Sequence, residues 1–562
     1  MRAPSDPGRG PPECQGGGET SDRLNDCPSS QWRPDSCTSH SCRHPIAKVK
    51  MTAIPVAPPE TRWATPKRVS LVPLVALIFF GVSGGAYGIE PLFSTSGPGM
   101  GILLILIAPL IYSVPHALVC AELGTAIPVE GGYYHWVKRG LGRFWAFQQG
   151  VLQWVCSFVD MALYPVMFTS YLSSLISAVA PGEHVLFEIA GLKIDLNWVI
   201  CVGVIVIFTL LNLMGAGWVG DSSVVFAIIC LTPMLILTAI GGYHLLTDGI
   251  NPVSQLTAEE GQSTWNAFGS GLFIVMWNYS GWDSVSTVAG EMENPKKHLP
   301  KALFWAVLLI VVGYLLPSLG ALAVGADGDN GWKSWKDGAF SDIAGQLAGP
   351  WLQYTVTIGG LFASVAMFSA LLASYSRLPS ALSRDGYLPG WVSKESKRYK
   401  MPMASIIGSS VIYALFCFSS FSNLVIFDVF LTNIGILLEV AALIMLRIRE
   451  PELERPYKIP GGWWSIGLIT VSLTAVSVWA AIEQYDEEGA KAVILCLIVV
   501  GISLVLYPLL SLRKAAKQSA ALDRAVANGT VPGEVYGLSG SQRDSAHSDK
   551  AAAATGTDSV EA

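Results

Sequence analysis

The chain has 562 residues, of which 51% are hydrophobic and only 14% are charged. Soluble domains contain roughly 25% charged residues, so this composition excludes an ordinary soluble protein. The net charge is −6, and the Lys and Arg residues stand in short stretches between apolar runs without forming a basic face, so we expect no nucleic-acid partner.

The two ends of the chain differ from everything between them. Residues 1–66 are rich in Pro, Gly, Ser and charged residues and contain no apolar run of the kind that marks a signal peptide. Residues 513–562 are polar and rich in Ala and Ser. Such segments cannot bury enough apolar surface to offset the entropy of ordering, so we predict a disordered tail at each end.

Between the tails, about twelve apolar runs are long enough to cross a hydrocarbon layer about 30 Å thick. They lie at 70–92, 99–121, 144–176, 197–214, 220–246, 264–290, 302–325, 350–377, 402–419, 423–446, 463–483 and 490–512. We therefore predict an all-α polytopic membrane protein. Its core at 67–446 contains ten spans in two five-span halves, at about 70–246 and 264–446, and two further spans follow at 447–512.

The distribution of basic residues predicts the orientation. With the N-terminus in the cytoplasm, sixteen Lys and Arg residues fall in the inside loops, at 138–143, 296–301, 377–400 and 447–458, and only four fall outside. Cytoplasmic loops of membrane proteins carry such an excess. Both termini are therefore predicted to be cytoplasmic.

Two spans carry interruptions near mid-membrane depth. In the first span, Gly81 to Gly88 contains four glycines in eight residues, and in the sixth the apolar pattern breaks at Trp277 to Ser284. Small residues also allow helices to pack closely, which would explain the first interruption alone. Paired interruptions at corresponding positions of two halves are instead typical of inverted repeats with a binding site at the midplane.

Acids inside spans need a partner, a proton or a cavity, so we treat them as candidate site residues. Structural pairing across the bundle explains Asp428 and Glu439 equally well. His116 could relay protons, but a histidine at such a place is more often a satisfied polar group. Trp282 flanks the second interruption and could offer its ring face to a cation. The predicted substrate site consists of Ser83, Gly84, Gly85, Glu90, Asp160, Asn278, Trp282 and Asp283.

These stretches resemble the amino acid–polyamine–organocation superfamily, and within it most closely the polyamine uptake transporters of plants and protists, which are similar to L-type amino acid transporters. The resemblance covers roughly 70–512. It rests on Ala121–Gly124, Gly131–Tyr133, Asp283–Thr287, Gly290-Glu291 and Asn294-Pro295, and on Phe79-Phe80, Val82–Gly85, Gly88–Glu90, Ser113–Pro115, Phe147–Gly150, Ala162–Pro165 and Arg455–Tyr457.

The resemblance implies proton-coupled uptake of putrescine, spermidine or spermine, and of dicationic herbicides such as paraquat, by rocking of a helix bundle against a scaffold. Some relatives use a Lys in the fifth span for coupling, but residues 220–246 contain no Lys. Glu122 and Asp160 are therefore the first proton-coupling candidates. The plant pattern usually carries an acid at the position of Gly81 and a Lys at that of Ser284, and this chain departs from it at both.

Other functions stay open at this point. A neutral or cationic amino-acid transporter of the same superfamily is the main alternative, and a non-transporting membrane receptor is a remote one. An enzyme is not expected, because the chain contains neither a His-Glu-x-x-His motif nor a Gly-Lys dipeptide.

We predict no cofactor and no metal site. The expected partners are a small-molecule substrate, the lipid bilayer and protons, and the sequence gives no indication of a partner protein. The plasma membrane is the default location, with an endomembrane as the alternative.

Overall fold

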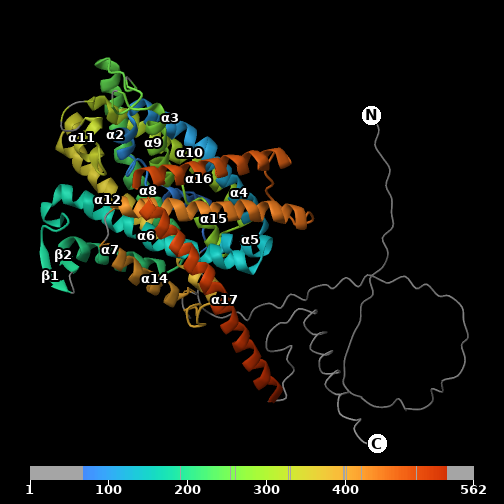
Figure 1. Cartoon of the computed structure of the whole chain (residues 1–562). Helices are drawn as coiled ribbons and strands as arrows, with labels where there is room; N and C mark the ends of the chain where they lie inside the picture. The colour runs from blue at the N-terminus through green and yellow to red at the C-terminus, as the bar shows by residue number, and fades with distance from the viewer. Residues whose placement is uncertain are drawn as a thin grey trace, which may run out of the picture. The chain divides into compact units, whose positions relative to one another are not determined.

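The computed structural model describes residues 68–527, apart from 190–191, 254, 260, 327, 329–330, 397–398, 400, 419–420 and 489. The predicted N-terminal tail at 1–66 and the last part of the predicted C-terminal tail, from residue 528 on, lie outside the described residues. The described part is mostly helical (Figure 1).

Each of the twelve predicted spans has a helical counterpart. Eight helical segments are long and apolar enough to cross a membrane, and the four shorter helices α1, α7, α9 and α14 complete the set. The spans correspond to α1 (Leu71–Val82), α3–η1–α4 (Pro98–Ala126), α6 (Arg143–Leu175), α7 (Leu196–Asn212), α8 (Ala216–Thr247), α9 (Thr264–Asn278) with η3 (Ser284–Glu291), α10 (Pro295–Ala321), α12 (Pro350–Tyr375), α14 (Met403–Phe416), α15 (Phe421–Arg449), α16 (Gly462–Glu488) and α17 (Ala490–Ala527). The predicted fold class is confirmed.

Both predicted interruptions are present. Helix α1 ends at Val82, and the chain stays non-helical until α2 (Pro91–Ser96) begins, with Gly85 and Gly88 at positive φ. Helix α9 ends at Asn278, and Gly281 has a φ of 95° before η3 begins. A Cβ at Gly281 would clash with the carbonyl oxygen of Gly81, so the two breaks lie directly against each other.

Several elements between the spans were not predicted. Helices α5 (Gly132–Leu141), α11 (Ala339–Ala348) and α13 (Arg377–Arg384) occupy connections, as do short 3-10 turns. Strands β1 (Val185–Ile189) and β2 (Leu192–Asp195) form an antiparallel hairpin, a small exception to the all-α prediction (Figure 1). Helix α17 continues to Ala527, so residues 513–527, predicted to be disordered, are helical here. Their Ala-rich sequence favours helix, which explains the difference.

Small residues bring two core helices into close contact. Gly241 of α8 and Gly320 of α10 pack so tightly that a Cβ at position 241 would clash with the backbone of Gly320. Next to it, Gly242 has no atom within 4 Å of the position its Cβ would take. Gly241 is thus required by packing, whereas Gly242 is not.

This difference predicts opposite results for two neighbouring substitutions. Gly241→Leu should lower the stability of the purified protein by about 1–3 kcal/mol, because it forces α8 and α10 apart. Gly242→Leu should leave the thermal unfolding midpoint unchanged or slightly raised, since Leu favours helix over Gly. Equal midpoints for both variants in detergent would contradict the close contact.

Candidate functional site

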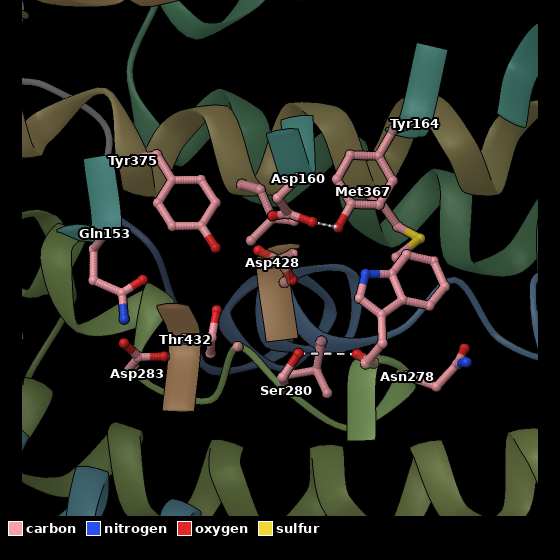
Figure 2. A pocket seen from close by; sticks show the side chains of 15 residues that line it. Gln153, Asp160, Tyr164, Asn278, Ser280, Asp283, Met367, Tyr375, Asp428 and Thr432 are labelled. Carbon is pink, nitrogen blue, oxygen red and sulfur yellow. Dashed lines mark hydrogen bonds between the residues drawn. The ribbon is translucent and has the colours of Figure 1, made fainter. Parts of the chain in front are cut away.

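A cavity lies where the two breaks meet (Figure 2). Five segments that lie far apart in the sequence contribute residues to its lining. Its lining consists of Gly81 and Val82 from α1, Gln153, Asp160 and Tyr164 from α6, Trp277, Asn278, Ser280, Gly281 and Asp283 around the second break, Met367, Leu371 and Tyr375 from α12, and Asp428 and Thr432 from α15.

Three aspartates dominate the polar part of the lining. Asp160, Asp283 and Asp428 are all buried. Tyr164 donates to Oδ1 of Asp160 at 2.7 Å, and the Cys156 thiol lies 2.8 Å from Oδ1 of Asp428. No Lys or Arg is among the described lining residues. The cavity therefore offers carboxyl groups without a fixed positive charge to neutralise them.

Aromatic side chains form another part of the wall. Tyr164, Trp277 and Tyr375 line the cavity. The indole of Trp282, predicted to face the substrate, is instead fully buried, and its Nε1 donates to the carbonyl of Tyr279 at 2.7 Å. Trp277, five residues earlier in the chain, thus lies where the sequence analysis expected Trp282.

The predicted residues of the first break lie beside the cavity but are absent from its described lining. Oγ of Ser83 accepts the amide N–H of Gly85 at 3.0 Å, which compensates for one lost helical hydrogen bond. A Cβ at Gly84 would lie only 2.7 Å from Sδ of Met367, so glycine lets α12 approach closely. The hydrogen bond of Ser83 and the close packing at Gly84 therefore give these residues a structural role.

The contacts of Glu90 are also structural. One carboxylate oxygen accepts the Gly88 amide at 2.7 Å, and the other accepts the Gly338 amide at 3.2 Å and the Tyr171 hydroxyl at 3.3 Å. Glu90 is fully buried and is not part of the described cavity lining. It binds the amide of Gly88, which the break leaves without a helical partner, and the amide of Gly338 at the start of α11.

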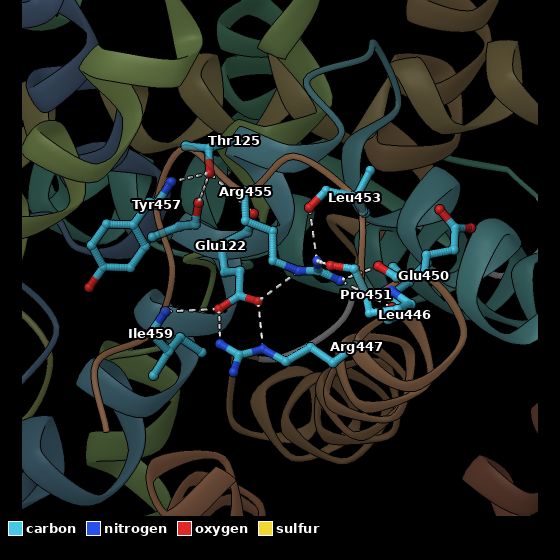
Figure 3. Close-up of polar contacts among 11 residues, drawn as sticks. Glu122, Thr125, Leu446, Arg447, Glu450, Pro451, Leu453, Arg455, Tyr457 and Ile459 are labelled. Atoms are coloured by element: carbon cyan, nitrogen blue, oxygen red, sulfur yellow. Dashed lines mark hydrogen bonds and ion pairs between the residues drawn. The ribbon is translucent and has the colours of Figure 1, made fainter. Parts of the chain in front are cut away.

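Glu122 lies in a separate cluster of charged groups (Figure 3). Arg447 binds both of its carboxylate oxygens, Nε of Arg455 lies 3.3 Å from Oε1, and the amide of Ile459 donates to Oε2 at 2.8 Å. This is the arrangement of a structural ion pair. Of the two predicted coupling residues, only Asp160 lines the cavity.

The two departures from the plant pattern lie next to each other. A Cβ at Gly81 would lie 3.0 Å from Oγ of Ser284. The resemblance implies an acid at the first position and a Lys at the second, so the two charges missing here would have been neighbours of opposite sign. Their joint absence leaves the charge of this part of the site unchanged.

Three further side chains carry donor atoms that a metal could use. Those of His116, Cys120 and Glu439 lie within 4.8 Å of one another. His116 and Gln149 are each within hydrogen-bond distance of Glu439, so hydrogen bonding accounts for the cluster without a metal. We assign no metal or cofactor to it.

Comparisons with known proteins identify the family of the chain. The family model for amino acid permeases matches residues 70–511. The chain belongs to the amino acid permease family. This permease is therefore an integral multi-pass membrane protein whose substrate is a small molecule.

Two plant proteins are similar to the permease over most of its length. A polyamine transporter of Oryza sativa subsp. japonica is 36% identical over 445 residues, which cover 79% of the permease and 78% of the rice protein. A probable polyamine transporter of Arabidopsis thaliana is 34% identical over 470 residues, which cover 83% of the permease and 88% of the relative.

Among solved structures, the crystal structure of MhsT in complex with L-phenylalanine is similar in fold. The TM-score is 0.52 at 15% identity, and the match covers 75% of the permease and 98% of MhsT. At this identity the likeness concerns the fold alone.

The sequence analysis missed part of the cavity. Asp428 was treated as a residue that structural pairing explains equally well, and Gln153, Tyr164, Met367, Tyr375 and Thr432 were not singled out. For Tyr164 a signal was available, because it follows Asp160 by four residues and thus shares its helix face.

The contacts of Glu122 predict a stability defect without a coupling defect. Glu122→Gln removes one partner of a buried ion pair, so we expect it to cost about 3–5 kcal/mol in unfolding free energy. Glu450→Gln, which breaks the more exposed pair with Arg139, should cost about 1 kcal/mol or less. The pH dependence of the transport that remains in Glu122→Gln should match wild type. A flattened pH profile would contradict this role.

Proposed function

We propose that this permease takes up polyamines such as putrescine, spermidine and spermine by proton-coupled alternating access. The observation that carries the proposal is the cavity with three buried aspartates and no basic residue in its described lining. The similarity to two plant proteins named as polyamine transporters supports the same substrate class.

The chemistry of the cavity suits a chain with several ammonium groups. Each ammonium can be paired with a carboxylate, and pairing is stronger in a buried site than in water because the effective dielectric is lower. Tyr164, Trp277 and Tyr375 add ring faces that attract cations and contact the methylene segments between the amines. Dicationic herbicides such as paraquat meet the same requirements.

An amino-acid substrate would use the cavity differently. Its carboxylate would need a basic side chain or free backbone amides, but the Gly85 and Gly88 amides of the first break are bound by Ser83 and Glu90. Three aspartates would meanwhile face a single ammonium group. We therefore place polyamines before amino acids.

Proton coupling and location complete the proposal. Of the two coupling candidates from the sequence analysis, Asp160 lines the cavity, so its carboxyl group is open to the substrate as well as to a proton. We place the protein in the plasma membrane with both termini in the cytoplasm, as the distribution of basic residues suggests.

Uptake of radiolabelled spermidine into cells that express the protein tests the substrate. Wild type should transport more at an outside pH of about 5.5 than of about 7.5, because protons move inward with the substrate. Asp428→Asn and Asp160→Asn should each raise the KM about tenfold or more, since losing one charged partner costs over 1.4 kcal/mol. Asp248→Asn alters an exposed aspartate beside His244 and serves as the control.

Competition separates the alternatives in the same assay. Unlabelled spermine should inhibit spermidine uptake, whereas leucine and arginine should not. Transport of leucine or arginine without spermidine uptake would replace the proposal with an amino-acid carrier. Correctly inserted protein that moves none of these compounds would favour a receptor.

A further inference from the structure

A second cluster of buried polar side chains adjoins the cavity, and the proposed function gives it no role. Its centre is Glu439 of α15, which lies 3.3 Å from Nε2 of His116 and accepts a hydrogen bond from Gln149 at 3.2 Å. The carboxyl of Asp283, which lines the cavity, lies within hydrogen-bonding reach of Glu439. His116, Gln149 and Glu439 are fully buried.

Two carboxyl groups in direct contact cannot both be charged in a buried place, because the repulsion between them is too large. A hydrogen bond between Asp283 and Glu439 therefore requires a proton that the two share. Nδ1 of His116 has no hydrogen-bond partner among the described residues, so the imidazole has a free nitrogen. The carboxyl groups of Asp283 and Glu439 can thus hold one proton between them, and the imidazole of His116 can accept that proton.

We propose that Glu439 and His116 form the proton site of this permease and that Asp283 connects it to the substrate. This inference deepens the proposed function and rests on it. An aspartate that binds both substrate and proton, as Asp160 would, exchanges one for the other. Uptake of both together requires a group that keeps the proton while the substrate is bound, and Glu439 with His116 is separated from the cavity by Asp283.

The proton balance follows from these contacts. In the empty site the proton lies between Asp283 and Glu439. When an ammonium group binds Asp283, the O–H bond to Asp283 breaks, and an O–H bond to Glu439 or an N–H bond to His116 forms. Asp283 is then a carboxylate paired with the substrate, and the proton stays bound one residue away. Substrate and proton are carried together.

The neighbouring groups leave the cluster without a fixed cation. The donor atom of Cys120 lies within 4.8 Å of those of His116 and Glu439. Tyr112, Tyr133 and Asp428, which precedes Glu439 on α15, are near enough to interact electrostatically with carboxyl groups of the cluster. The Glu122 and Arg447 pair is satisfied within its own cluster. Among the described hydrogen-bond partners of His116, Asp283 and Glu439 there is no Lys or Arg. The shared proton therefore supplies the positive charge that no side chain provides.

The cluster also joins parts of the protein that belong to different helices. His116 lies on α4, Glu439 on α15, and Asp283 on the break before η3. A movement of α15 relative to α4 would separate the imidazole from the carboxyl. The protonation state of the pair can thus favour one arrangement of these helices over another.

Proteoliposomes containing the purified full-length protein test the proposal, with the membrane potential clamped at zero. Two assays are compared: exchange of labelled for unlabelled spermidine without a gradient, and accumulation driven by a gradient of about two pH units. One proton per substrate can support at most about a 100-fold ratio, because each pH unit is a factor of ten. Exchange reports substrate binding and movement, whereas accumulation also requires coupling.

We expect Glu439→Gln and His116→Gln to keep exchange within about twofold of wild type and to lose accumulation at least about tenfold, the usual scale of losing a proton-transfer group. Both amides retain hydrogen-bonding atoms near the original positions. Asp248→Asn, which removes an exposed carboxyl outside the cluster, is the control and should behave as wild type in both assays.

Other outcomes overturn the proposal in distinguishable ways. Accumulation that stays normal in Glu439→Gln would show that the proton is bound elsewhere. Loss of exchange together with accumulation would place Glu439 in the substrate site or in the fold. Wild type that exchanges arginine or leucine but not spermidine would refute the proposed substrate alone, and the same comparison with that amino acid would then decide the proton site.

Discussion

The architecture depends on one constraint: backbone amides and carbonyls that leave a helix inside a membrane must find other partners, because hydrocarbon offers none. The two breaks meet this need through each other and through neighbouring side chains. Asn278 donates to the carbonyl of Gly88 at 3.4 Å, Tyr314 donates to the carbonyl of Asn278 at 2.9 Å, and Glu90 binds the amide of Gly88. The cavity lies at this junction, where the non-helical backbone is sheltered from hydrocarbon.

The buried acids of the described residues fall into three groups with different chemistry. Glu122 is bound by two arginines, Glu90 by backbone amides, and the acids of the cavity and of the Glu439 cluster by hydroxyl, thiol, amide or imidazole groups. Buried carboxylates with guanidinium partners hold structure together, since removing one partner is costly. Carboxyl groups without such partners remain available to a cation or a proton. The absence of arginine, more than the presence of an acid, therefore distinguishes the candidate site from the scaffold.

Sequence reasoning located the spans and both breaks because length, apolar composition and clustered glycines act locally. It also selected Asp160, Asn278 and Asp283, which line the cavity. It could not separate Trp277 from Trp282, because both flank the break and only the turn at Gly281 decides which ring faces inward. Nor could it separate Glu122 from Asp160, since Arg447, which binds Glu122, follows it by 325 residues. Contacts across helices, which no periodicity records, made this difference.

The ion pair of Glu122 bears on how the chain enters the membrane. Its partner Arg447 follows 325 residues later, so span two is synthesised long before the arginines that bind its acid. During that interval the side chain must stay near the aqueous interface or carry a proton, because an unpaired charge is costly inside the bilayer. This end of α4 can therefore reach its final position only after α15 and the segment that follows it have been synthesised. A chain truncated before Arg447 would lack the arginines that bind Glu122 on α4.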